Sequence, residues 1–208
     1  MSDQCYLMTH SLLSSWLHAM KSSPYDDATM ERDSYAEFLQ ALRREAVETT
    51  EAMQRGIDFE DLVTAIVRND PVGMQKHPEW FESASIIADT VRGGLMQYRA
   101  RKQIRVGGMT ILLYGRLDVL KAGIIYDIKF SSGYEVGKFY DSTQHPAYLE
   151  IIPEAEKFVY LVSNGKEVFR EQYRRDEVPP ITTTIQNFID WLNDSGLMPV
   201  YKEKWIAL

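Results

Sequence analysis

The chain has 208 residues, 45% of them hydrophobic and 25% charged, which is enough apolar material for one domain with a full core. No linker rich in Pro, Gly or Ser divides it, so we expect a single domain over residues 1–208. A formal net charge of −7 excludes a global attraction to phosphate, so any contact with nucleic acid must depend on local basic clusters.

The lone Cys5 excludes a disulfide framework, and it excludes a cysteine-ligated zinc or iron–sulfur site within one chain. No uninterrupted apolar segment approaches bilayer length, so we expect no contact with a membrane. The start of the chain lacks a basic region followed by an apolar run. We therefore expect a cytoplasmic protein, and the sequence leaves its oligomeric state open.

The first half of the chain favours helices. Ser34-x-x-Glu37 before an apolar run has the pattern of a capping box and predicts a helix start at Ser34. Residues 59–67 form a second amphipathic run, and residues 80–98 predict a third, long helix.

The second half favours strands. Residues 103–106 and 110–113, around Gly107-Gly108, predict a hairpin that continues into a second hairpin over residues 115–130. Residues 158–162 and 168–173 predict another hairpin, and Pro179-Pro180 precedes an amphipathic helix. The order of elements predicts an α/β fold with a central mixed β-sheet flanked by helices.

Two basic clusters are candidates for contacts with a DNA backbone. The alternative for each is a solvated surface. The clusters are Arg92, Arg99, Arg101, Lys102 and Arg105, and Arg170, Arg174 and Arg175.

The hairpin over residues 115–130 carries the most informative pattern. If Ala122-Gly123 is a two-residue loop, Asp118 lies directly opposite Asp127, with Cβ atoms about 4.5–5.5 Å apart. Like charges in that position are destabilising, and a cation would relieve the repulsion. Because side chains alternate along a strand, Asp127 and Lys129 share a face.

Two carboxylates and an ammonium on one patch suit the hydrolysis of a phosphodiester. Hard divalent cations such as Mg²⁺ prefer carboxylate oxygens, and a metal-bound water is a far stronger acid than bulk water. Lys129 would orient that water or stabilise charge on the phosphate. The alternative is that Asp118 and Asp127 form surface ion pairs with Arg116 and Lys129.

Three ordered motifs resemble a known family. Gly-x-x-Asp118 followed by Asp127-x-Lys129 resembles motifs II and III of the PD-(D/E)xK nuclease superfamily. Gln144-x-x-x-Tyr148 resembles the additional motif of its RecB-type branch, and the closer likeness is to compact phage or prophage-type exonucleases. The cysteine cluster of the iron–sulfur members is absent from the sequence, so no iron–sulfur cluster is expected.

The resemblance implies a restriction-endonuclease-like core and assigns roles to residues. Asp118 and Asp127 would be metal ligands, the Ile128 carbonyl a further ligand, and Lys129 the catalytic lysine. The segment at residues 56–60 resembles motif I, which makes Glu60 the third acidic ligand. The alternative for Glu60 is that it simply favours a helix N-terminus, where the macrodipole stabilises negative charge.

Gln144 and Tyr148 are four residues apart and therefore share one helix face. With Thr143 as N-cap, Pro146 falls in the first turn, where its missing N–H costs nothing. Gln144 would then point at a phosphate or at the catalytic patch. The alternative is a helix end with an ordinary core tyrosine.

Together these patterns predict a deoxyribonuclease that depends on Mg²⁺ or Mn²⁺. Within this class we expect an exonuclease. Its site would comprise Glu60, Asp118, Asp127, Lys129, Gln144 and Tyr148, with DNA as the substrate. One alternative is a nuclease-fold module that binds DNA or a protein without cutting. Another is an endonuclease, or an enzyme that cuts RNA, with the same chemistry.

Overall fold

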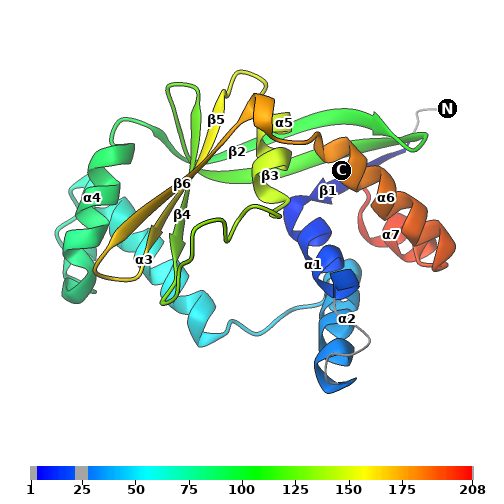
Figure 1. Ribbon diagram of the computed structural model, residues 1–208, viewed down its shortest axis with the longest axis horizontal. Coiled ribbons are helices and arrows are strands. Elements are labelled where there is room, and N and C mark those ends of the chain that lie inside the picture. The colour runs from blue at the N-terminus through cyan, green and yellow to red at the C-terminus, as the bar shows by residue number, and fades with distance from the viewer. Residues whose placement is uncertain (1–3, 22–27, 208) are drawn as a thin grey trace.

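The computed structural model describes residues 4–21 and 28–207. In this part of the chain, six strands form one mixed sheet in the order β1-β3-β4-β5-β6, with β2 paired to β3 (Figure 1). β1 with β3 and β4 with β5 are parallel pairs, and the other pairs are antiparallel. The strands are β1 (Cys5–Thr9), β2 (Leu95–Val106), β3 (Met109–Lys121), β4 (Ile124–Phe130), β5 (Lys157–Ser163) and β6 (Val168–Arg174). The expected α/β class with a mixed sheet is confirmed.

Helices flank this sheet. α3 and α4 lie at one end of the molecule, on the left in Figure 1, and α1, α2, α6 and α7 lie at the other. The α-helices are α1 (His10–Lys21), α2 (Ala28–Arg43), α3 (Glu51–Arg68), α4 (Phe81–Val91), α5 (Gln144–Ile151), α6 (Ile181–Asp194) and α7 (Met198–Lys204). Short 3-10 helices are η1 (Gly73–Gln75), η2 (Pro78–Trp80) and η3 (Arg175–Glu177). No helix of the described residues is both long and apolar enough to cross a bilayer.

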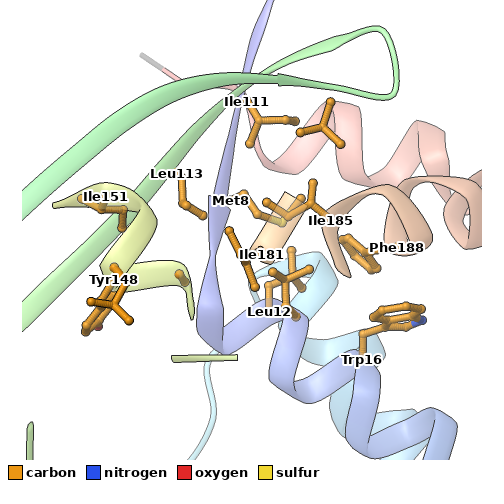
Figure 2. Packing of buried hydrophobic residues seen from close by; sticks show 14 of the residues in the cluster. Met8, Leu12, Trp16, Ile111, Leu113, Tyr148, Ile151, Ile181, Ile185 and Phe188 are labelled. Atoms are coloured by element: carbon orange, nitrogen blue, oxygen red, sulfur yellow. The ribbon is translucent and has the colours of Figure 1, made fainter. Parts of the chain in front are cut away.

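The apolar side chains form two buried clusters. In the larger cluster Leu12 and Trp16 of α1 pack with Phe188 of α6 and with residues of β3 and α5 (Figure 2). In the smaller cluster Phe59 and Ile66 of α3 pack with α4 and with the strands β4 and β5. The two clusters hold the helices of both ends against the sheet, since burial of apolar area is the main favourable contribution to folding.

Local sequence determines the turn at the tip of β3 and β4. Ala122 and Gly123 adopt φ angles of +48° and +73°, as a type I′ hairpin turn requires. The pairs Lys121 with Ile124, Leu120 with Ile125 and Val119 with Tyr126 follow from it. The predicted two-residue loop is therefore confirmed, and so is the predicted register over these three pairs.

Two expectations about helices are wrong. The helix expected over residues 80–98 ends at Val91, because Gly93 takes a φ of +82° and the Gly94 N–H bonds the Val91 carbonyl at 2.9 Å. β2 starts at Leu95. Ser34 does not start a helix either, because α2 already includes Ala28 and Ser34 is buried within it. The strand β1 and the helix α7 were not anticipated.

Candidate active site

The candidate site lies where β3 and β4 part. β2 pairs with β3 over nearly its whole length, so β1 and β4 must share the other edge of β3. β1 ends its pairing at Tyr114 and β4 pairs only from Val119 onward, so residues 115–118 have no strand beside them on that edge. This opening in the sheet holds the motif residues.

The helix α5 fills the opening. Its Tyr148 hydroxyl donates to the Arg116 carbonyl at 3.1 Å, and its ring lies directly against Gly115. A Cβ on Gly115 would lie 2.4 Å from Cε1 of Tyr148, which explains why glycine stands at this position. Burial raises the pKa of Tyr148, so its hydroxyl stays protonated and acts as a tether between α5 and β3.

Asp127 is the most buried carboxylate of the site, with 2% of its surface exposed. Its Oδ1 accepts a hydrogen bond from the Gln144 side-chain amide, so the predicted partnership of the last motif with the acidic patch is present. Its Oδ2 lies 2.8 Å from the Lys129 Nζ as an ion pair. Apart from this contact with Lys129, no group of the described residues donates to Oδ2.

The sequence predicted that Asp118 faces Asp127 in a continuous ladder, and this prediction is wrong. The ladder stops one pair earlier, and the Asp118 Oδ2 accepts the backbone N–H of Ile128 at 2.8 Å. Burial, followed by repulsion from Asp127 and Glu60, raises the pKa of Asp118 well above its ordinary value. The carboxylates therefore repel each other as expected, although the backbone geometry differs.

Ile128 directs its carbonyl towards the same opening. The N–H and C=O of one strand residue point to the same edge of the strand. Because the Ile128 N–H points to Asp118, its C=O also faces β3 rather than β5. This orientation is compatible with the ligand role that the family resemblance implies.

Glu60 lies in the middle of α3, which begins at Glu51 with Thr50 as its cap. The helix macrodipole acts within the first turn only, so the helix N-terminus does not account for Glu60. Burial raises its pKa and Asp127 adds to the rise, while Arg116 and a hydrogen bond from Gln97 oppose it. Glu60 is thus electrostatically part of the same site.

Lys129 is a permanent cation in this setting. Burial alone would lower its pKa, but attraction to Asp127, Asp118 and Glu60 outweighs that effect and raises the pKa. A lysine that keeps its proton near neutral pH stabilises negative charge and cannot serve as a general base.

The sequence did not single out Gln97, which takes a left-handed φ of +53° that is uncommon for a residue other than glycine. It sits across from Asp118, between two ladder pairs of β2 and β3. Its amide donates to Glu60, and its Oε1 is buried without a hydrogen bond. Such local strain concentrates at functional sites.

His10 is a second residue that the sequence did not reveal. Its ring stands edge-on to Tyr148, with centroids 5.2 Å apart, and its Nδ1 is buried without a hydrogen-bond partner among the described residues. Burial and the nearby Lys129 lower its pKa to about 4, so the ring is neutral near pH 7. No spacing of histidines in the sequence could have signalled this contact, because it depends on the docking of α5 against the end of β1.

The side chains fit a hard divalent cation by their chemistry. Asp118 and Asp127 repel each other, the buried Oε1 of Gln97 lacks a hydrogen bond, and Oδ2 of Asp127 contacts only the Lys129 ammonium. Carboxylate and carbonyl oxygens are the ligands that Mg²⁺ and Mn²⁺ prefer. Among the described residues, no three His, Cys, Asp or Glu side chains converge tightly enough to form a preassembled metal site.

Most residues of the two predicted basic clusters have structural partners. Arg92 pairs with Asp89 at 3.1 Å and Lys102 with Glu150 at 2.7 Å. Arg175 donates to the carbonyls of Leu149, Ala155 and Ile152, which end or follow α5, and Arg174 pairs with Asp176 at 3.1 Å. These four basic residues therefore have structural roles that explain them without a contact to DNA.

Comparison with known proteins gives little further information. No protein-family model matches the chain, and a search of curated proteins found no match. One similar solved structure is described as "Crystal structure of SSO0001". It is 18% identical in sequence, the similarity covers 63% of this chain and 75% of that chain, and the TM-score is 0.41. A likeness of this size says nothing about activity.

Proposed function

We propose that this protein is a deoxyribonuclease that hydrolyses DNA phosphodiester bonds with Mg²⁺ or Mn²⁺. The observation that carries the proposal is the state of Asp127, which is buried with one oxygen fixed by Gln144 and the other held only by the Lys129 ammonium. A purely structural ion pair has no need of a second buried carboxylate with a raised pKa, which Asp118 supplies. Two buried carboxylates beside one lysine support a site that binds a divalent cation.

The residues have distinct roles in the proposal. Asp118, Asp127 and the Ile128 carbonyl would hold the ion, with Glu60 as the third acidic ligand. The bound ion would lower the pKa of a water molecule and offset the charge of the phosphate. Lys129 would stabilise the charge that develops on the phosphate oxygens as the water oxygen bonds to phosphorus and the bond to the leaving sugar oxygen breaks. Gln144 would hold Asp127 in orientation, and Tyr148 would hold α5 in place.

The exonuclease part of the proposal depends on the resemblance to phage-type exonucleases, and such an enzyme would act on DNA in the cytoplasm. The rival from another class is a nuclease-fold module that binds without cutting. The raised pKa values of Asp118 and Glu60 weigh against that rival, since a binding module gains nothing from buried carboxylates that repel each other.

The test is incubation of linear, nicked and closed circular DNA, and of RNA, with the purified protein in Mg²⁺ or Mn²⁺. We expect linear DNA to be degraded from its ends, with closed circular DNA resistant. Equal rates of hydrolysis of closed circular and linear DNA would show that the protein is an endonuclease and not an exonuclease. No hydrolysis of any of these substrates would leave the binding module as the function.

A further inference from the structure

We propose that one face of the β2–β3 ribbon is the track along which the phosphate backbone of the substrate leaves the active site. This arginine face consists of Arg99, Arg101 and Arg105 of β2 and Arg116 of β3. The inference builds on the proposed function, because the track begins at the candidate site.

The starting point is a hollow that is lined by the carboxylates of Glu60 and Asp61 as well as by basic side chains. Its volume is about 300 Å³, and it opens between α3 and the ribbon. Three arginines contribute to its wall, from α3, β2 and β3, so a nucleic-acid strand bound at the carboxylates would meet positive charge directly beside them. The lining residues used here are Glu60, Thr64, Arg68, Gln97, Arg99 and Arg116.

Arg99 and Arg116 stand directly opposite each other in the β2–β3 ladder, and both are exposed. Directly opposed residues have Cβ atoms about 4.5–5.5 Å apart, where like charges destabilise the pair. In the described part of the chain, neither guanidinium forms an ion pair with a carboxylate. An anion placed between them would remove the repulsion, and a phosphate suits the planar donors of arginine.

The arginine face continues along β2 away from the hollow. Arg101 and Arg105 follow Arg99 at even spacing, so the three side chains leave the ribbon on the same side, and all three are exposed. The intervening Ala100 and Ile104 pack against the larger core cluster. Six residues of strand span about 20 Å, which matches the rise of about six base pairs of duplex DNA.

The partners of the basic residues separate Arg99, Arg101 and Arg116 from an ordinary solvated surface. Arg92 and Lys102 of the same segment are paired, Arg92 with Asp89 and Lys102 with Glu150. Arg101 forms no ion pair among the described residues, as is also true of Arg99 and Arg116. In a protein with a net charge of −7, carboxylates are available to pair with arginines, yet none of the described ones lies within ion-pair distance of these three. Arg116 is close enough to Glu60 to oppose the rise in the pKa of that carboxyl, and Arg99 and Arg101 have no such neighbour among the carboxyl groups whose pKa is shifted. The pattern favours an external anion with repeating charges.

The experiment measures binding of fluorescently labelled DNA to the full chain in EDTA as a function of salt, so that no cleavage occurs. Each phosphate contact contributes about 0.9 to the slope of log K against log salt. The double variant Arg99→Gln/Arg116→Gln should lose about 2 units of slope. Arg92→Gln, which removes one positive charge from an ion pair outside the face, should leave the slope unchanged. The thermal stability of Arg99→Gln without DNA should equal or exceed that of wild type, because the repulsion from Arg116 is gone while the attraction of Arg116 to Glu60 remains.

The proposal is wrong if the slope of log K against log salt is the same in the double variant as in wild type. It is also wrong if the slope falls equally in Arg92→Gln. An Arg99→Gln variant that unfolds at a lower temperature than wild type also overturns it, since Arg99 would then have a structural partner. Failure of the proposed function gives a different result. In that case the slope of the double variant still falls by about 2 units, but wild type hydrolyses no DNA with Mg²⁺ or Mn²⁺. The arginine face would then be a DNA-binding surface of a protein that is not a nuclease.

Discussion

Replacing Asp118 by Asn should make the metal-free protein more stable and abolish its activity. The pKa of Asp118 is raised in the folded protein, so the folded state keeps a proton that the unfolded state releases above its ordinary pKa of 3.8. Stability of the wild type in EDTA should therefore fall as the pH rises from that ordinary value towards the folded-state pKa. The Asn variant lacks this titration and should not show the fall.

The size of the effect follows from two opposing contributions. Each unit by which the pKa of Asp118 is raised amounts to about 1.4 kcal/mol of destabilisation at neutral pH. The hydrogen bond from the Ile128 N–H survives, because the Asn carbonyl also accepts it, but loss of the charge weakens it by about 1 kcal/mol. In a chain of this length a net gain of about 1 kcal/mol corresponds to about 2–4 °C in Tm.

Thermal unfolding in EDTA, followed by circular dichroism over a range of pH, measures this difference. The gap between variant and wild type should be widest at neutral pH and close towards low pH, where Asp118 is protonated in both states. Asp89→Asn breaks a surface ion pair with Arg92 and should change stability by about 0.5 kcal/mol or less at every pH. A variant less stable than wild type at neutral pH would refute the claim that Asp118 is held at an electrostatic cost.

Three further predictions concern the same site. Lys129→Ala should lower the rate of hydrolysis by about two orders of magnitude or more in steady-state assays while leaving Mn²⁺ affinity nearly unchanged, and loss of metal binding with normal folding would mean that Lys129 has a different role. Gln144→Ala should reduce the rate by less than Lys129→Ala does, because it frees Asp127 without removing a charge, and an unaffected rate would return α5 to a purely structural role. Gly115→Ala should destabilise the protein by about 1–3 kcal/mol in urea unfolding, because the new methyl group meets the Tyr148 ring, whereas Gly133→Ala, which has open space around it, should have little effect.

The parts of the fold that depend on local chemistry could be predicted from the sequence. The Ala122-Gly123 turn determined the register of the hairpin, and that register placed the two aspartates and Lys129 together. The predicted start of α5 directly after Thr143 is correct, although the Thr143 hydroxyl donates to the His10 carbonyl and does not cap the helix. Each of these predictions needed only neighbouring residues, turn geometry and the alternation of side chains.

The parts that failed depend on contacts between distant segments. Gln97 and Glu60 are 37 residues apart in sequence, and only the packing of α3 against the ribbon brings them together. Residues 95–98 continue an apolar pattern that suits a helix, but two glycines end α4 and β3 offers a strand partner. The opposed aspartates were expected in a regular ladder, but β4 stops pairing with β3 after Tyr126.

The most direct test of the central claim measures metal binding and DNA hydrolysis on the same preparations of wild type and Asp127→Asn. Titration calorimetry with Mn²⁺ gives the affinity, and digestion of linear DNA in Mn²⁺ or in EDTA gives the activity. We expect wild type to bind Mn²⁺ and to degrade DNA only when the metal is present. We expect Asp127→Asn to remain folded and to lose both metal binding and DNA hydrolysis. Hydrolysis by wild type in EDTA, or by Asp127→Asn at the wild-type rate, would contradict the central claim.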